Sequence, residues 1–166
     1  MPLSTGSKAK LNSLYPPLAS AMLKLAEMAE GEGIIIIITQ ALRTWAEQDK
    51  LYAKGRTEPP IGPQHFVTKA KGGSSFHNFT LAADIAVMDG DVVNWDADDP
   101  RYKRCGEIGR SLGLEWGGDW KGFRDVPHFQ WATKLSLGEC RQLFLDGGLS
   151  AVLDEVAKAD SPSSAT

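Results

Sequence analysis

The sequence has little cysteine, and this shortage excludes two kinds of structure. Two cysteines in 166 residues cannot build the disulfide framework of a small secreted domain. No Cys-x-x-Cys pair is present, which excludes a thiolate zinc site. Cys105 and Cys140 each fall on the apolar side of an expected helix. We therefore predict that both are buried free thiols, the usual state of unpaired cysteine.

The sequence also lacks a basic excess and a long hydrophobic run. The net charge is −3, whereas proteins that bind nucleic acid normally cluster lysine and arginine. The apolar run at 34–38 is far shorter than the ~20 residues needed to cross a bilayer. The first residues contain no apolar stretch typical of a signal peptide. We expect a protein that binds no nucleic acid, has no transmembrane segment or signal peptide, and is made in the cytoplasm.

Hydrophobic periodicity and turn residues predict a mixture of helices and strands. Residues 1–15 are polar and are expected to be irregular. Helices are expected over 17–30, 44–55, 99–112, 136–147 and 150–158, strands over 34–39, 81–87 and 127–131, a long loop over 56–75, and an acidic turn over 88–99. Because helices and strands do not alternate regularly, we predict an α+β fold, with a small, mainly antiparallel sheet flanked by helices. One domain is expected over 1–159, followed by a disordered tail over 160–166.

Two of the expected strands each carry a residue that can bind a metal. Side chains alternate between the faces of a strand. Ile85 and the apolar residues two positions away share one face, so Asp84 points to the opposite face. In the strand at 127–131, Phe129 faces the core, whereas His128 and Gln130 point away from it. Both strands therefore offer a possible metal ligand on the face away from the core.

A second imidazole in the sequence provides the third ligand that a zinc site needs. His77 precedes Asp84 by seven positions, and two imidazoles with one carboxylate form a three-ligand zinc site with an open fourth position. Asp125 is close enough to His128 in the sequence to act as a base beside the metal. Arg43 could stabilise negative charge in a transition state. From the residues alone, a hydrogen-bonded His–Asp pair without metal remains the alternative, and no substrate follows.

Several motifs together resemble a known family. The segment 75–84, Ser-Phe-His-Asn-Phe-Thr-Leu-Ala-Ala-Asp, resembles the Ser-x-His-x-x-Gly-x-Ala-x-Asp signature of zinc D-alanyl-D-alanine peptidases. This family includes the VanX and VanY types and phage L-alanyl-D-glutamate endopeptidases. Further matches follow in order within 42–57, 67–73, 114–120, 125–130 and 140–152. The resemblance covers about residues 12–155 and implies a DD-peptidase architecture, which hedgehog-type domains resemble.

The resemblance implies a role for each residue at the metal. His77, Asp84 and His128 would be the zinc ligands. Asp125 would act first as the general base and then as the general acid. Arg43 would hold the substrate carbonyl or the oxyanion.

The resemblance also implies residues around the substrate. Ser75 and Gln48 would contact the substrate or support the groups that do. Trp116 and Trp120 would line the cleft, with core packing as the alternative for each. This chain departs from the signature at Thr80, where the family has glycine. If that position requires a positive φ, a β-branched residue is poorly suited to it, and catalytic efficiency is the property affected.

These expectations add up to a zinc metallopeptidase that hydrolyses peptidoglycan stem peptides. We predict a monomeric, bacteriolytic phage endolysin that cuts the L-alanyl-D-glutamate bond, with release from the cytoplasm to the periplasmic wall through a holin. A D-alanyl-D-alanine carboxypeptidase or dipeptidase is the alternative within the enzyme class. A non-catalytic, zinc-containing module that binds peptidoglycan is the alternative outside it. His65 is expected to face solvent, and the acidic residues of 88–99 are expected to form a solvated turn rather than a cation site.

Overall fold

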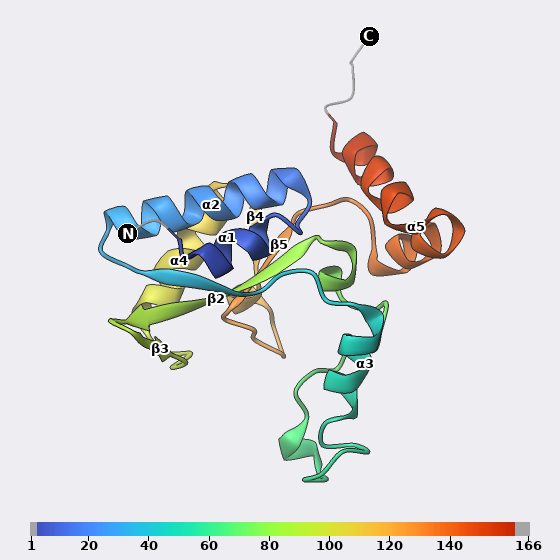
Figure 1. Ribbon diagram of the computed structural model, residues 1–166, viewed down its shortest axis with the longest axis horizontal. Coiled ribbons are helices and arrows are strands. Elements are labelled where there is room, and N and C mark those ends of the chain that lie inside the picture. The colour runs from blue at the N-terminus through green and yellow to red at the C-terminus, as the bar shows by residue number, and fades with distance from the viewer. Residues whose placement is uncertain (1–2, 162–166) are drawn as a thin grey trace. The chain divides into compact units, whose positions relative to one another are not determined.

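A computed structural model describes residues 3–161 of the chain (Figure 1). Residues 162–166 of the expected disordered tail lie outside the described residues, whereas Asp160 belongs to the last helix. The described residues form two compact units, one from 3–42 with 80–132 and the other from 43–79 with 133–161. The single domain expected over 1–159 stays a prediction.

The helices and strands have the following bounds. The α-helices are α1 (Thr5–Leu11), α2 (Pro16–Gly31), α3 (Trp45–Ala53), α4 (Pro100–Ser111) and α5 (Leu137–Asp160); the 3-10 helices are η1 (Pro63–His65), η2 (Phe76–Phe79) and η3 (Gly117–Asp119); the strands are β1 (Ile36–Gln40), β2 (Ala82–Asp89), β3 (Val92–Asn94), β4 (Leu114–Trp116) and β5 (His128–Trp131). No helix among the described residues is long and apolar enough to cross a membrane.

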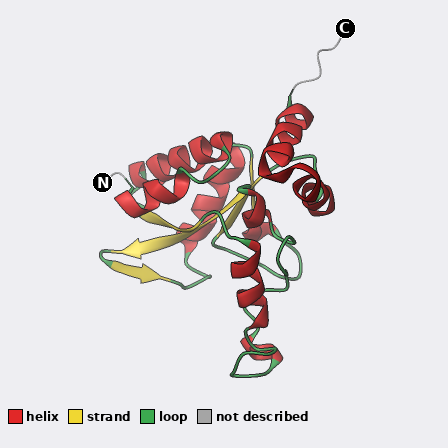
Figure 2. Ribbon diagram, turned by 45° about the vertical axis from the view of Figure 1, so that its right-hand side comes forward, coloured by secondary structure: helices red, strands yellow, loops and turns green. Residues whose placement is uncertain are grey.

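The first unit contains a five-stranded sheet. Its strand order is β1-β2-β5-β4, and β3 pairs with the far end of β2 to form the hairpin that Figure 2 shows. Neighbouring strands run antiparallel. Together with the helices around it, this sheet confirms the predicted α+β class and the mainly antiparallel pairing.

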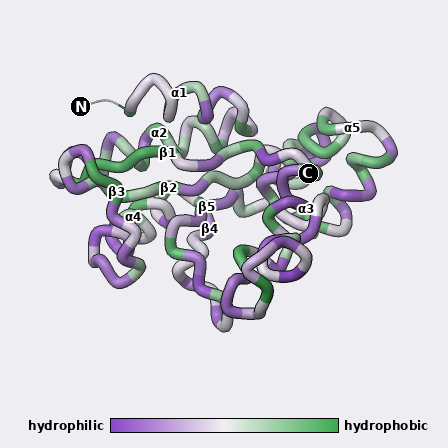
Figure 3. The backbone as a smooth tube through the Cα atoms, turned by 60° about the horizontal axis from the view of Figure 1, so that its bottom comes forward, coloured by the Kyte–Doolittle hydropathy of each residue, from purple (hydrophilic) through white to green (hydrophobic). Residues whose placement is uncertain are grey.

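One face of this sheet forms the hydrophobic core. Ile38, Ile85 and Phe129, from three neighbouring strands, are no more than 1% exposed and belong to one buried cluster with side chains of α1, α2 and α4. Figure 1 shows α1 and α2 along the same side of the sheet, and the isoleucines of β1 lie at the hydrophobic end of the scale in Figure 3. The helices therefore occupy one face, and the polar side chains of β2 and β5 remain on the other.

The prediction that residues 1–15 are irregular is wrong. They contain α1, whose N-terminus is capped by the Ser4 side chain. Its buried side chains include Ser7 and Leu11, and the Ser7 hydroxyl accepts a hydrogen bond of 3.0 Å from the backbone N–H of Ile38. The buried face of α1 includes the polar residue Ser7, whose hydroxyl pairs with a backbone N–H of β1. The apolar residues of this segment therefore do not recur at helical spacing, and hydrophobic periodicity did not reveal the helix.

Most other boundaries follow their predicted signals. Thr44 and Glu47 form the expected capping box of α3, and Asp99 caps α4 before Pro100. The first strand begins at Ile36 rather than at residue 34. The short strand β4 was not predicted, because three residues are too few to show alternation.

The second unit is built around three aromatic rings. The indole of Trp45 stacks on Phe144 of α5 with ring centroids 5.1 Å apart, and Phe79 of η2 meets both rings edge-on. The helix α5 has non-helical backbone at Gly148, which agrees with the two successive helices predicted there. Since Phe79 ends η2, this cluster anchors the short helix that carries His77.

Candidate metal centre

Asp84 and His128 face each other directly across two strands. They are register partners in the antiparallel pair β2–β5, and His128 Nδ1 lies 3.1 Å from Asp84 Oδ1. The side chain of His128 is 7% exposed and that of Asp84 is 20% exposed. Because their neighbours Ile85 and Phe129 lie in the core cluster, these two side chains occupy the opposite face, as the alternation predicted.

The electrostatic surroundings of His128 favour a cation beside its ring. Burial of the imidazole lowers its pKa, but the hydrogen bonds to Asp84 and Gln130 and the charges of Asp84 and Asp125 together raise the pKa above the ordinary value of 6.5. The negative field that holds a proton on the ring would equally attract a metal ion to the same lone pair. Zinc and protons therefore compete for this position.

His77 is held by a network of local hydrogen bonds in the second unit. It is 3% exposed in η2, its backbone N–H donates to Ser75 Oγ at 3.4 Å, and its carbonyl accepts from the Arg43 N–H at 3.1 Å. The buried Asn78 side chain accepts from the N–H groups of Gly73 and Ser75 and donates to the Arg43 carbonyl. Asn78 thus ties the loop before η2 to the segment that carries Arg43.

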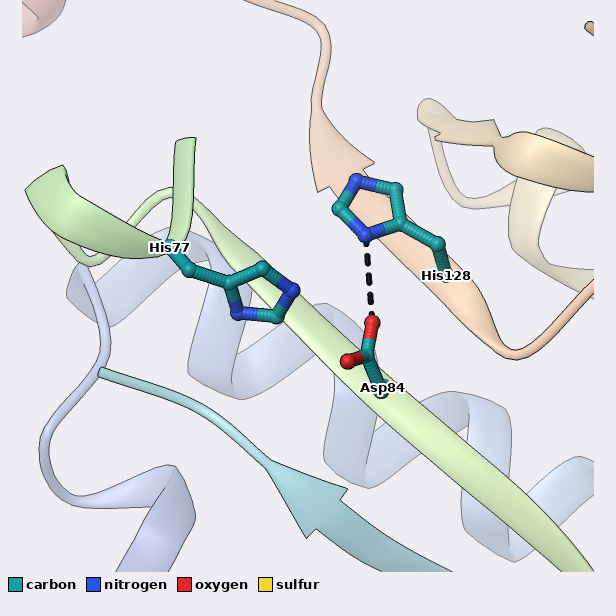
Figure 4. A group of neighbouring side chains, drawn as sticks. All are labelled: His77, Asp84 and His128. Atoms are coloured by element: carbon teal, nitrogen blue, oxygen red, sulfur yellow. Dashed lines mark hydrogen bonds and ion pairs between the residues drawn. The ribbon is translucent and has the colours of Figure 1, made fainter. Parts of the chain in front are cut away.

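His77, Asp84 and His128, the three candidate ligands, form one group of side chains that could hold a metal ion. One ligand atom from each lies within 4.8 Å of the other two, and Figure 4 shows the three groups converging from η2, β2 and β5. Tetrahedral zinc with ligands at ~2.0–2.2 Å needs ligand atoms roughly 3.3–3.6 Å apart. Two nitrogen donors and one oxygen donor within 4.8 Å of one another form a donor set that fits zinc after small side-chain adjustments, and three protein ligands would leave the fourth position open.

Asp125 lies in the turn that leads into β5. Its N–H donates to the Gly117 carbonyl at 3.0 Å, and its own carbonyl accepts from the His128 N–H at 3.2 Å. The turn leaves no space beside Gly117, because a Cβ added there would lie 2.3 Å from the Asp125 carbonyl oxygen. Gly117 therefore allows the backbone to pack closely against the turn that carries Asp125, the candidate base.

Arg43 and Gln48 form a pair in the second unit. The amide oxygen of Gln48 accepts from Arg43 Nη1 at 2.9 Å, while its Nε2 donates to the Ala70 carbonyl at 2.8 Å. Gln48 is fully buried. Its side chain therefore fixes the guanidinium of Arg43 to the loop at residues 68–70, which is a supporting role rather than an open binding position.

The two tryptophans predicted near the substrate lie in different surroundings. Trp116 is 5% exposed, belongs to the core cluster and donates its Nε1–H to the Val126 carbonyl at 2.8 Å. Trp120 is 37% exposed, and its ring centroid lies 5.0 Å from that of His128. Core packing therefore describes Trp116, whereas Trp120 has the accessible surface that a cleft residue needs.

Thr80 adopts the backbone conformation for which the family signature has glycine. Its φ is 62°, and it is the one non-glycine residue in 3–161 with a positive φ. Its buried hydroxyl has no hydrogen-bond partner in the described part of the chain. The position therefore requires a left-handed residue, and threonine occupies it under strain.

The acidic residues of 88–99, His65 and the two cysteines have the structural roles expected from the sequence. Asp89 and Asp99 form ion pairs with Arg101 at 2.7 and 2.6 Å, and Asp98 contacts Arg124 at 3.3 Å, so these acidic residues are neutralised by arginine. His65 is exposed in η1. Both cysteines are buried free thiols, and burial raises the pKa of Cys105 to about 12 and of Cys140 to about 11.

Two residues with supporting roles were not assigned from the sequence. Asn78 organises the loop before η2, and the Gln130 amide oxygen lies 3.0 Å from His128 Nε2, where it can only accept. The alternation had placed Gln130 on the same face as His128, and this was the signal that could have identified it. Asn78 carried no comparable signal, because its partners are backbone groups of a loop.

Comparisons with known proteins agree with the class that this site suggests. A His–Asp–His group with an open position is typical of hydrolytic zinc enzymes. The model of the D-alanyl-D-alanine carboxypeptidase family matches residues 68–131. The chain is 38% identical over 128 residues to the peptidoglycan L-alanyl-D-glutamate endopeptidase CwlK of Bacillus subtilis (strain 168). This alignment covers 72% of this chain and 74% of that protein. The chain belongs to this peptidase family.

A phage relative supports the same assignment, and a solved structure shares the fold. The chain is 31% identical over 129 residues to the L-alanyl-D-glutamate peptidase of Listeria phage A118, covering 77% of this chain and 41% of that protein. It therefore spans about two fifths of the phage relative. A mutant of the vancomycin resistance D,D-pentapeptidase VanY, solved with Zn(II), shares the fold with a TM-score of 0.54 and 18% identity, covering 84% of this chain and 80% of that chain.

Proposed function

We propose that this protein is a zinc peptidase that hydrolyses the L-alanyl-D-glutamate bond in peptidoglycan stem peptides. The observation that carries the proposal is the grouping of His77, Asp84 and His128, whose ligand atoms lie within 4.8 Å of one another. The choice of bond rests on the two relatives, both of which bear the name of that activity. Peptidoglycan is then the substrate and zinc the cofactor.

The side chains of this chain supply the remaining chemistry. Bound zinc would polarise the scissile carbonyl and make a water molecule more acidic. The Asp125 carboxylate takes the proton from the attacking water and passes it to the leaving amine nitrogen, so that one group serves as base and then as acid. The backbone bonds of Asp125 to Gly117 and His128 hold it in the turn beside a ligand.

Arg43 stabilises the negative charge that develops on the carbonyl oxygen. A guanidinium remains charged at any working pH and offers several N–H donors. Gln48 holds Nη1 of Arg43 at 2.9 Å, so the cation is positioned before the substrate arrives. Ser75 supports the loop before His77, and the exposed ring of Trp120 offers an apolar surface to the stem peptide.

Digestion of purified peptidoglycan tests the proposed bond. Mass spectrometry of the muropeptides should reveal new N-terminal D-glutamate in the presence of the zinc-loaded protein. Asp125→Asn should bind zinc as tightly as the parent and lose roughly 10²–10⁴-fold in rate, the usual contribution of a general acid–base group. Digests without new N-terminal D-glutamate would refute the assigned bond.

A second activity is favoured by the name of the matching family model. A D-alanyl-D-alanine carboxypeptidase would release free D-alanine from the same digests and leave no new N-terminal D-glutamate. Retained binding to peptidoglycan without either product would instead indicate a non-catalytic module. The single digest therefore separates the three functions by their products.

We propose a lysis role as the biological setting, and the phage relative supports it. The protein would be made in the host cytoplasm, would reach the periplasmic wall through a holin, and would act there as a bacteriolytic monomer. Expression in a thin-walled host should leave the culture turbid unless a holin is expressed with it. Lysis without a holin would contradict this route.

A further inference from the structure

A row of three polar side chains crosses strands β4 and β5 and ends at a metal ligand. Glu115 and Gln130 are register partners, and Gln130 Nε2 donates to Glu115 Oε2 at 2.8 Å. Gln130 Oε1 lies 3.0 Å from His128 Nε2. Gln130 is 8% exposed and His128 is 6% exposed, so the contact between these two side chains is shielded from water.

The chemistry of the outer residue sets the direction of every hydrogen bond in this row. A carboxylate only accepts, so the Gln130 amide must turn its NH₂ toward Glu115. Its carbonyl oxygen then faces His128, and an oxygen can only accept there as well. The Gln130 oxygen therefore favours the neutral tautomer with its hydrogen on Nε2 and its lone pair on Nδ1, in competition with the Asp84 carboxylate, which accepts at Nδ1 when no cation lies between the two atoms.

The lone pair so selected lies where the metal is expected. His128 Nδ1 is the nitrogen that lies 3.1 Å from Asp84 Oδ1, and two acceptors at that distance are stabilised by a cation between them. The opposite tautomer would direct an N–H toward Asp84 and leave no lone pair for the metal. Tautomer choice therefore decides whether His128 can be a ligand at all.

We propose that Glu115 is a positioning residue that, through Gln130, fixes the tautomer of His128 and so raises its affinity for zinc. This inference rests on the proposed zinc function and extends it to an exposed residue on β4 that touches neither metal nor substrate. The partner of a ligand's second ring nitrogen commonly contributes 10–100-fold in metal affinity. Glu115 lies one hydrogen bond further from the metal position than Gln130. We therefore expect its contribution to zinc affinity at about the lower end of this range, roughly tenfold.

Zinc affinity and the ring nitrogen signals of His128 test the proposal. Gln130→Leu should weaken zinc binding about 10–100-fold. Glu115→Gln, at an exposed position that does not endanger folding, should weaken it on the order of tenfold, because the amide at 130 is then free to turn over. In ¹⁵N spectra of the two metal-free proteins, the fraction of neutral His128 that carries its hydrogen on Nε2 should be lower in Glu115→Gln than in the parent.

A swap of the two groups provides the rescue. In the double variant Glu115→Gln with Gln130→Glu, a carboxylate at 130 accepts from the imidazole and from the amide at 115, so the original direction of the bonds returns at the same net charge. Its zinc affinity should recover to at least the parent value. The matched control is Glu107→Gln, which makes the same change on α4, where the carboxylate contacts Arg104.

Two failures remain distinguishable. If the parent binds no zinc, or if His77→Ala binds it unchanged, the proposed zinc function fails. If the parent binds zinc through its ligands but Glu115→Gln binds equally well and keeps the parent's ratio of His128 tautomers, the role of Glu115 is overturned. Loss in the single variant without recovery in the swap would also overturn it, since a general effect of mutation would then account for the loss.

Discussion

Asp84 and His128 are register partners on adjacent antiparallel strands, and 3.1 Å separates Asp84 Oδ1 from His128 Nδ1. The pairing of β2 with β5 thus brings together two candidate ligands that are 44 residues apart in the sequence. The face that carries them is polar because the other face of the same strands forms the core. The fold and the site therefore depend on the same alternation.

Removal of the Asp84 charge should abolish tight zinc binding. Asp84→Asn keeps the size of the side chain but leaves two nitrogen ligands and a weak amide oxygen. The affinity should fall by more than the 10–100-fold typical for loss of an outer-shell partner. In thermal unfolding, zinc should raise the Tm of the parent and have little effect on the variant. An equal zinc-induced shift in both proteins would exclude Asp84 as a ligand.

Substitution of the strained threonine should stabilise the protein. Thr80→Gly relieves a left-handed residue, which costs about 1–2 kcal/mol, but adds about 0.5–1 kcal/mol of chain entropy to the unfolded state. The variant also removes a buried hydroxyl without a partner in the described residues. We expect a gain of about 1 kcal/mol, or roughly 2–4 °C in Tm. The exposed Thr57→Gly should give no gain, and a destabilised Thr80→Gly would contradict the strain.

Disruption of the Gln48 clamp should separate catalysis from metal binding. Gln48→Leu removes the acceptor of Arg43 Nη1 and the donor to the Ala70 carbonyl, which should cost about 1–3 kcal/mol in stability. A displaced arginine should lower kcat by roughly 10²-fold, the cost of a lost oxyanion donor, while zinc affinity stays unchanged. Gln142→Leu on the exposed face of α5 is the control, and an unchanged kcat in Gln48→Leu would argue against the clamp.

The pairing of Asp99 with Arg101 should make stability depend on acid pH. Hydrogen bonds from the Arg101 side chain and backbone lower the pKa of Asp99 from 3.8 to about 2. A depressed pKa contributes stability that is complete above the unfolded value and is lost as pH falls through about 2. Since asparagine also caps helices, Asp99→Asn isolates the charge and should cost about 1 kcal/mol at pH 7. In urea unfolding, a deficit that stays constant down to pH 2 would contradict this pairing.

The sequence predicted the strand face of the candidate ligands Asp84 and His128 better than it predicted the residues that support them. Asp84 and His128 were placed by alternation, because a one-sided core leaves a period of two in any strand. The helix α1 was missed because Ser7 is buried for a hydrogen bond, and the clamp roles of Gln48 and Asn78 depend on loop backbone that no local pattern encodes. The positive φ at Thr80 was anticipated only because the family signature has glycine there.

The most direct test of the zinc peptidase compares two histidines of the same unit. His77→Ala removes a ligand, whereas His65→Ala removes an exposed imidazole of η1. Bound zinc and the rate of new N-terminal D-glutamate should be measured on the same samples of parent and both variants. We predict one zinc per chain and full cleavage for the parent and His65→Ala, and loss of both in His77→Ala. Cleavage by zinc-free His77→Ala at the parent rate would contradict the account.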